Sequence, residues 1–133
     1  MPIVEIDLST AGLIAAGEYV GNVNSVRYQV KTGESWNFEG TDDVDFDTWK
    51  GFGDDKRRLQ YSISLPNQPS VFHEFYLVPK ALPFLKNFFK ACGVLGRGGF
   101  DPEAPVGKQV GVRVGIKDDP TYGEQNTFSF FRV

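Results

Sequence analysis

Runs of alternating hydrophobic and polar residues recur along this chain, and such alternation predicts half-buried β-strands. The alternation is cleanest over residues 108–117, where glycines and cations occupy the outward positions. The side chains expected to face the core there are Val110, Val112, Val114 and Ile116. Residues 57–65 alternate in the same way. Their apolar face is formed by Leu59, Tyr61, Ile63 and Leu65.

Residues 18–31 predict a longer strand whose alternation changes phase part-way along. Tyr19 and Val23 stand at odd positions, whereas Val26, Tyr28 and Val30 stand at even positions. A β-bulge near Asn24 would restore the phase, because a bulge adds one residue to one of two paired strands. Further strands are expected at residues 35–39, 71–78 and 127–133.

One helix is predicted after residue 78, because apolar residues recur there at helical spacing. The recurring residues are Leu82, Leu85, Phe89 and Cys92. Pro79 or Pro83 can occupy the first turn, where a missing backbone N–H is not needed. Gly93 is expected to end the helix, because glycine readily adopts the left-handed conformation of that position.

Five or six strands, with one helix before the last pair, favour a mainly β fold. We expect a small OB-like barrel of five or six strands with one α-helix, because glycines within the strands allow them to bend. A β-sandwich or a jelly-roll fragment is the alternative. The 133 residues are expected to form a single OB-like domain, with residues 1–16 as an N-terminal arm and residues 39–55 as an acidic loop insertion.

The acidic residues are concentrated in that insertion. The chain has 14 Lys and Arg against 17 Asp and Glu, a formal net charge of −3, and residues 39–55 hold seven of the acids with one Lys. The remainder has 13 basic and 10 acidic residues, so a mildly basic, aromatic body carries an acidic segment. The segment is either a solvated loop or a mobile competitor for an anion-binding surface.

Residues that carry enzyme chemistry are scarce. The chain has one cysteine, Cys92, and one histidine, His73, too few for a zinc site or a Cys–His catalytic pair. Phosphate-loop, hydrolase and metalloprotease motifs are missing. The acidic run at residues 42–47 lacks the central glycine and the terminal glutamate of an EF-hand loop. We therefore expect no enzyme activity, no metal and no cofactor.

Cations and aromatic rings instead indicate binding to single-stranded nucleic acid. Arg113 and Lys117 project from the outward face of a predicted strand, between glycines that either open the backbone to a ligand or let the strand coil. The first predicted hairpin adds further cations and three rings. The nine candidate contact residues are Arg27, Tyr28, Lys31, Trp36, Phe38, Arg57, Arg58, Arg113 and Lys117.

Four segments carry a family resemblance. They read GEYVGNVNSVRYQVKTGES, RRLQYSISL, FYLVPKALPFLKNFFKACGV and PVGKQVGVRVGIKDDPTYGEQNTFSFF, within residues 17–131. They resemble the small phage-encoded single-stranded DNA-binding proteins with an OB-type fold, including related phage proteins without an assigned function. The resemblance implies sequence-tolerant binding of single-stranded DNA in phage replication or recombination, with replication or recombination proteins as further partners. The acidic segment lies outside this pattern.

The alternative function is that of a structural or assembly protein of a virus, or of a protein-interaction module, without nucleic acid. No apolar run approaches the roughly 18 residues of a membrane span. Residues 1–9 lack the basic and apolar regions of a signal peptide. We therefore expect no membrane and a location in the cytoplasm of an infected host cell. The oligomeric state and the choice between DNA and RNA stay open.

Overall fold

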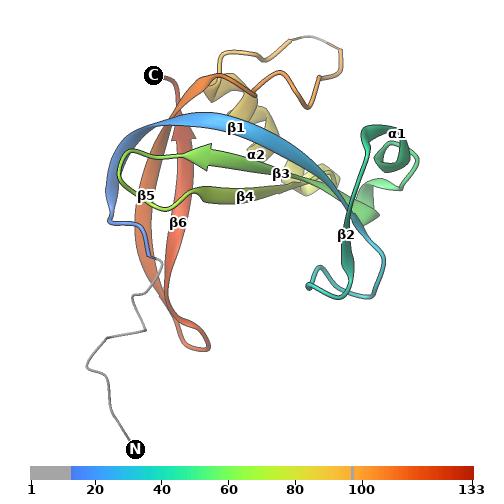
Figure 1. Ribbon diagram of the computed structural model, residues 1–133, viewed down its shortest axis with the longest axis horizontal. Coiled ribbons are helices and arrows are strands. Elements are labelled where there is room, and N and C mark those ends of the chain that lie inside the picture. The colour runs from blue at the N-terminus through green and yellow to red at the C-terminus, as the bar shows by residue number, and fades with distance from the viewer. Residues whose placement is uncertain (1–12, 97) are drawn as a thin grey trace, which may run out of the picture.

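The computed structural model describes residues 13–96 and 98–133, and its main feature is one antiparallel sheet of six strands (Figure 1). The strands are β1 (Gly17–Lys31), β2 (Thr41–Val44), β3 (Arg57–Ser64), β4 (Val71–Tyr76), β5 (Gln109–Asp119) and β6 (Gly123–Phe131). Their order is β4-β3-β1-β5-β6, and β2 pairs with the C-terminal part of β1. The mainly β prediction is confirmed.

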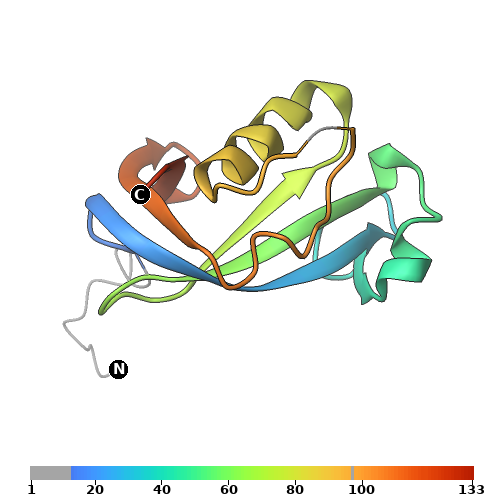
Figure 2. The same cartoon turned by 90° about the horizontal axis from the view of Figure 1, so that it is seen from above.

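In residues 13–96 and 98–133, two α-helices and two short 3-10 helices accompany the sheet. They are α1 (Phe46–Trp49), α2 (Leu82–Ala91), η2 (Asp54–Lys56) and η3 (Pro79–Ala81). Figure 2 shows α2 on one side of the sheet, and α2 corresponds to the predicted helix. Gly93 follows it with a φ of 75°, as its role in ending the helix requires. Within the described part of the chain, neither α1 nor α2 is long and apolar enough to cross a membrane.

The central strand β1 is divided by a bulge at the predicted place. Its pairing with β3 shifts register between Val23 and Ser25. On its other side, the first half of β1 pairs with β5 and the second half pairs with β2. At the bulge, the Val23 N–H donates to the Lys108 carbonyl over 2.9 Å, and the Gly107 N–H donates to the Val23 carbonyl over 2.8 Å. The bulge therefore keeps the apolar side chains of both halves on the core side.

The main core lies between α2 and the sheet. Phe88 of α2 is fully buried, and its ring centroid lies 4.9 Å from those of Tyr61, Phe75 and Phe130. These rings come from β3, β4 and β6, so one helix residue joins three strands. Burial of this large apolar area is the main source of stability for a small β-fold.

Three of the four β5 residues predicted to face the core do so. Val110, Val112 and Val114 are at most 3% exposed, which confirms the register of the strand. Ile116 is 45% exposed, and its prediction as a core residue is wrong. It lies opposite Asn126 in the part of the β5–β6 hairpin that extends away from α2 (Figure 1), so the helix does not cover it.

The outward glycines of β5 are covered by side chains of β6. A Cβ atom at Gly111 would lie 2.3 Å from a ring carbon of Phe131, and one at Gly115 would lie 2.6 Å from Thr127 Oγ1. Both distances are shorter than a van der Waals contact. These glycines therefore make room for neighbouring side chains, and the interpretation that they open the backbone to a ligand is wrong.

The sheet is not closed into a barrel. In the described residues, β4 pairs only with β3, and β6 pairs only with β5. Aromatic side chains occupy the space between these two edge strands. The ring of His73 on β4 lies 6.0 Å from that of Phe128 and 5.2 Å from that of Phe130, both on β6. Contacts between rings therefore connect β4 and β6, where backbone hydrogen bonds would close a barrel.

We expect the stability of the fold to fall as the pH drops through the titration range of His73. Burial among the rings lowers the pKa of His73 below its ordinary 6.5, while the neighbouring Glu74 carboxylate acts in the opposite direction. The unfolded chain therefore binds a proton that the folded chain disfavours, so the free energy of unfolding decreases below about pH 6.5. Urea midpoints between about pH 5 and 8 measure this slope, at most about 1.4 kcal/mol per pH unit.

His73→Phe is the control for this prediction, because the chain has one histidine. The free energy of unfolding of this variant should change little across the same interval, since carboxylates titrate mainly at lower pH. Equal slopes in the two proteins would show that His73 does not sense the pH.

Residues 39–55 are folded, and their prediction as a loop is wrong. β2 extends the sheet beside β1, and α1 follows directly. The Asp45 carboxylate caps α1 by accepting a 2.7 Å hydrogen bond from the Thr48 N–H, which lowers the pKa of Asp45. Trp49 is 3% exposed and anchors the segment against the rest of the protein. One buried indole therefore orders a segment whose charge suggested a solvated loop.

The prediction of a strand at residues 35–39 is also wrong, because these residues form bends and a turn. The Thr32 N–H donates to the Gly40 carbonyl over 2.9 Å, and the Gly40 N–H donates to Asn37 Oδ1 over 2.7 Å. These bonds close a tight loop between β1 and β2. Trp36 and Phe38 therefore project from a loop and do not share one face of a strand.

The predicted N-terminal arm lies mostly outside the described residues, which begin at residue 13. Ile14 is 3% exposed. Its N–H donates to Asn126 Oδ1 over 2.7 Å, and its carbonyl accepts from Asn126 Nδ2 over 2.8 Å. The described end of the arm is therefore tied to β6.

Candidate functional site

The face of the sheet that points away from α2, which we call the outer face, carries a row of hydrogen-bonded side chains. Asp43, Gln29, Arg58 and Tyr76 are opposite neighbours on β2, β1, β3 and β4. Gln29 Nε2 donates to Asp43 Oδ1 over 2.9 Å, and Arg58 Nε donates to Gln29 Oε1 over 2.7 Å. Arg58 Nη1 donates to Tyr76 Oη over 3.1 Å. The row therefore links four strands through their side chains.

Arg58 is a buried charge within this row. It is 9% exposed, and its guanidinium carbon lies 4.6 Å from the ring centroid of Trp36 and 5.7 Å from that of Tyr76. It forms no ion pair with any described residue, and its Nη2 has no hydrogen-bond partner among them. A buried cation without a carboxylate is costly unless other groups satisfy it. The site therefore favours an incoming acceptor or anion.

A hollow of about 540 Å³, which we call the outer pocket, opens above the row. Its floor comes from β1 and β3, and its walls come from β2 and the loop between β1 and β2. The floor residues are Arg27, Gln29, Arg58 and Gln60. The wall residues that bear on its chemistry are Trp36, Phe38, Thr41, Asp42 and Asp43. Donors, acceptors and aromatic faces thus converge on one open cavity.

Exposed rings and cations surround the outer pocket. Phe38 at its wall is 99% exposed, and Phe72 on β4 is 52% exposed. The guanidinium carbon of Arg27 lies 6.0 Å from the ring centroid of Phe72, and Lys31 Nζ lies 5.9 Å from that of Trp36. Flat apolar faces therefore stand beside positive charges, an arrangement suited to bases and phosphates.

Five of the nine predicted contact residues gather on this face. They are Arg27, Lys31, Trp36, Phe38 and Arg58. Tyr28 does not join them, because successive residues of a strand point to opposite faces. Its hydroxyl donates to Glu103 Oε1 over 2.7 Å, and its ring lies 5.4 Å from that of Trp49. Burial and this hydrogen bond raise the pKa of Tyr28.

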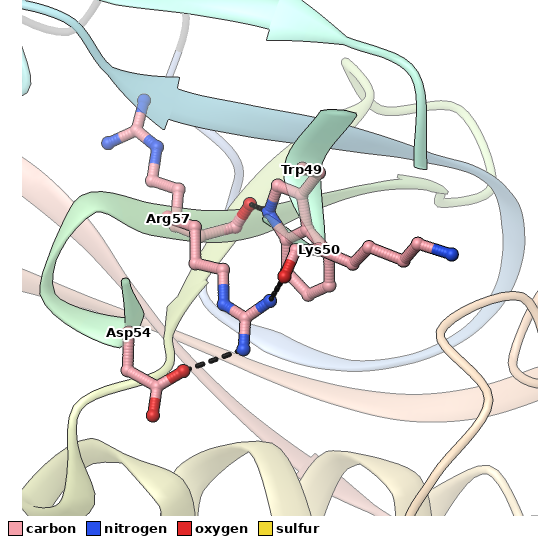
Figure 3. Close-up of polar contacts among 5 residues, drawn as sticks. Trp49, Lys50, Asp54 and Arg57 are labelled. Carbon is pink, nitrogen blue, oxygen red and sulfur yellow. Dashed lines mark hydrogen bonds and ion pairs between the residues drawn. The ribbon is translucent and has the colours of Figure 1, made fainter. Parts of the chain in front are cut away.

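Arg57 is engaged inside the folded acidic segment (Figure 3). Its Nη2 lies 2.6 Å from Asp54 Oδ1, and its Nη1 donates to the Lys50 carbonyl over 3.3 Å. Its guanidinium carbon lies 4.5 Å from the ring centroid of Trp49, whose Nε1 donates to the Arg58 carbonyl over 3.1 Å. Arg57 therefore holds the segment onto β3 and does not face the outer pocket.

Arg113 and Lys117 lie on β5, which pairs with the other half of β1, across the bulge from the pocket residues. Arg113 Nη2 and Nε donate to Glu18 Oε1 over 2.9 and 3.0 Å, and its guanidinium carbon lies 5.4 Å from the ring centroid of Phe131. Its charge is therefore already balanced by a carboxylate. Lys117 is exposed near the end of the hairpin.

Comparison with protein-family models, with curated proteins and with solved structures finds no match to this chain. The resemblance to phage single-stranded DNA-binding proteins therefore stays a prediction.

Sequence reasoning missed several residues of this face. Phe72 and Tyr76 supply rings from β4, while Gln29 and Asp43 complete the hydrogen-bonded row. The alternation of residues 71–78 could have indicated the two rings. Phe72 and Tyr76 both stand at even positions, and they alternate with residues that are buried. Neither Gln29 nor Asp43 stands out, since their partners come from other strands.

The remaining reactive groups of the described residues offer little chemistry. Cys92 is 7% exposed, and burial raises its pKa to about 11, so its thiol stays protonated near neutral pH. No three His, Cys, Asp or Glu side chains gather as metal ligands within the part of the chain that the structure describes. The outer pocket is therefore the best-supported candidate site.

Proposed function

We propose that this protein binds single-stranded nucleic acid across the outer face of β1, β3 and β4, largely without regard to sequence. The observation that carries the proposal is the outer pocket itself. It combines a buried guanidinium that lacks a carboxylate partner among the described residues with a ring that is 99% exposed. Nucleic acid is the ligand class that offers both anionic groups and flat aromatic faces.

The rings and cations support a path for a strand along this face. Phe38 and Phe72 are exposed enough for bases to stack on them, and such stacking is insensitive to sequence because every base has an aromatic face. Arg27 and Lys31 lie beside rings, where they can contact the phosphates that flank a stacked base. The phosphate contacts add affinity that depends on salt.

The topology also supports the proposal. An OB-type fold is a five-stranded, partly open barrel that binds oligonucleotides on the face of its second and third strands. The order β4-β3-β1-β5-β6, with a helix between β4 and β5, suits an open variant of that fold in which β2 is an addition. The sequence resemblance to phage single-stranded DNA-binding proteins agrees with this interpretation, and on it we propose a role in phage replication or recombination.

We expect wild-type protein to bind a short fluorescently labelled oligonucleotide, with affinity that falls as salt rises. Arg27→Ala should lower the slope of log K against log salt by about 0.7, the value for one phosphate contact on a single strand. Phe38→Ala should weaken binding by about 1–3 kcal/mol, because it removes one stacking face. Fluorescence anisotropy at several salt concentrations measures both effects.

Lys86→Ala is the matched control, since it removes one exposed positive charge from α2 on the opposite side of the sheet. The oligonucleotide affinity of this variant, and the slope of log K against log salt, should equal those of the wild type. If wild-type protein shows no binding that depends on salt, or if all three variants behave alike, the outer face does not bind nucleic acid.

A protein-interaction role is the second candidate, and one observation favours it. An apolar hollow of about 280 Å³ lies between α2 and the loop that follows it. Leu95 and Phe100 line this hollow and are 45% and 43% exposed. Apolar surface of this kind suits a protein partner. This candidate gains weight if the oligonucleotide experiment fails.

A further inference from the structure

We propose that the outer pocket selects nucleobases that carry an exocyclic amino group, so that it discriminates against thymine and uracil. This inference rests on the proposed binding of single-stranded nucleic acid and names the base that enters one subsite. Elsewhere on the outer face, Phe72 offers a base an exposed ring beside the Arg27 guanidinium. The outer pocket places hydrogen-bonding side chains of β1, β2 and β3 around one space.

The wall of the outer pocket formed by β2 carries a hydrogen-bond acceptor. The Gln29 amide is engaged at both ends, because its Nε2 donates to Asp43 and its Oε1 accepts from Arg58. Asp43 Oδ2 has no donor among the described residues. Asp42 also lines the pocket, but it lies opposite the buried Val30 and alternates with Asp43, so it adds negative charge and is not counted as an acceptor. Thr41 Oγ1 is buried and has no hydrogen-bond partner in the described structure. The β2 wall therefore offers Asp43 Oδ2 as an acceptor to an incoming N–H group.

The donors lie on the opposite side of the pocket. Arg58, which is 9% exposed, retains an Nη2 group without a partner, and Arg27 lines the same floor. A base that bridges the pocket must then present an N–H group toward β2 and an acceptor toward Arg58. Cytosine does so with its N4 amine and its O2 carbonyl, and carboxylates commonly accept from that amine.

Thymine and uracil fit this arrangement poorly. Their one ring-edge donor is N3–H, which has a carbonyl oxygen on each side, whereas the cytosine amine has a carbonyl on neither side. An N3–H group directed at Asp43 would therefore bring a carbonyl oxygen close to the same carboxylate. The negative charges of Asp42 and Asp43 also repel phosphates, so the sugar–phosphate backbone is directed toward Arg27 and Lys31 instead. The acidic wall of the pocket therefore admits a base edge and keeps the backbone outside.

Oligodeoxycytidine and oligothymidine of equal length provide the test, with the full chain as the binding protein. Wild-type protein should bind oligodeoxycytidine about fivefold more tightly or better, the lower end expected for one well-placed pair. The double variant Asp42→Asn/Asp43→Asn should bring the ratio of the two affinities close to one. Asparagine keeps an oxygen that can accept from Gln29, so the Arg58 row is preserved in this variant.

Asp47→Asn/Asp55→Asn is the matched control, because it removes two charges from the same acidic segment outside the pocket lining. It should raise both affinities by a similar factor and leave their ratio unchanged. Equal binding of the two oligonucleotides by wild-type protein overturns the base selection while the proposed function stands. A collapse of the ratio in the control would also overturn it, since charge alone would then set the preference. Absence of binding to either oligonucleotide removes the proposed function as well.

Discussion

Phe88→Ala should lower the free energy of unfolding by about 3–5 kcal/mol. The side chain is fully buried and packs against rings from β3, β4 and β6, so its removal leaves a cavity where α2 meets the sheet. The surrounding strands cannot all move inward to fill that space, which adds a cavity cost to the lost apolar burial. Urea denaturation followed by circular dichroism measures the change.

Phe84→Ala is the control on the same helix. Phe84 is 70% exposed, so the same substitution should change the free energy of unfolding by no more than about 0.5 kcal/mol. Similar losses in the two variants would mean that α2 is not docked on the sheet through its Phe88 side. If Phe88→Ala does not fold, Phe88→Leu retains most of the volume and gives a smaller, measurable loss.

Trp49→Ala should also destabilise the protein strongly, by about 3–5 kcal/mol if the whole domain unfolds as one unit. Trp49 is 3% exposed, donates to the Arg58 carbonyl and lies beneath the Arg57 guanidinium. Without the indole, β2 and α1 lose their main anchor. Limited proteolysis should then cut within residues 39–56 at protease concentrations that leave the wild type intact.

Trp36→Ala provides the comparison for this result, because Trp36 is only partly buried and packs on the outer face. It should cost less stability than Trp49→Ala and should weaken oligonucleotide binding more. An unchanged urea midpoint and unchanged proteolysis in Trp49→Ala would contradict the packing of the acidic segment. The two tryptophans therefore separate folding from binding.

The fold of the acidic segment changes how its role in binding can be tested. Deletion of residues 41–54 would remove β2 and the buried Trp49 together with the acids, so any effect on binding would include a loss of structure. Substitutions of Asp42 and Asp43 by asparagine remove charge and preserve the backbone. The notion of a mobile competitor thus gives way to carboxylates held in the wall of the pocket.

Local pattern was sufficient for much of the secondary structure. The strands at β3 and β5, the bulge in β1 and the helix ending before Gly93 are all predicted by the spacing of apolar residues and by glycine. These features depend on neighbours within a few positions, because the alternation of a strand and the turn of a helix are set by the backbone itself. The chain also indicated Arg27, Trp36, Phe38 and Arg58 as candidates for binding.

Other features were decided by contacts between distant parts of the chain. The charge of residues 39–55 predicted a solvated loop, whereas one tryptophan inserted against β3 orders them. Tyr28 and Arg57 looked like surface residues, yet they pair with Glu103 and Asp54. No local pattern reports such partners, because the energy of a side chain depends on what the fold places opposite it.

The outer pocket also combines features set by the local sequence with features set by tertiary contacts. The sequence by itself determined which side chains of β1 and β3 share a face, since parity along a strand decides that. Only the tertiary structure decided that Asp43, Gln29, Arg58 and Tyr76 form one row, because this depends on the register of four strands. It also decided that the sheet stays open between β4 and β6, where aromatic side chains fill the space that a backbone ladder would need.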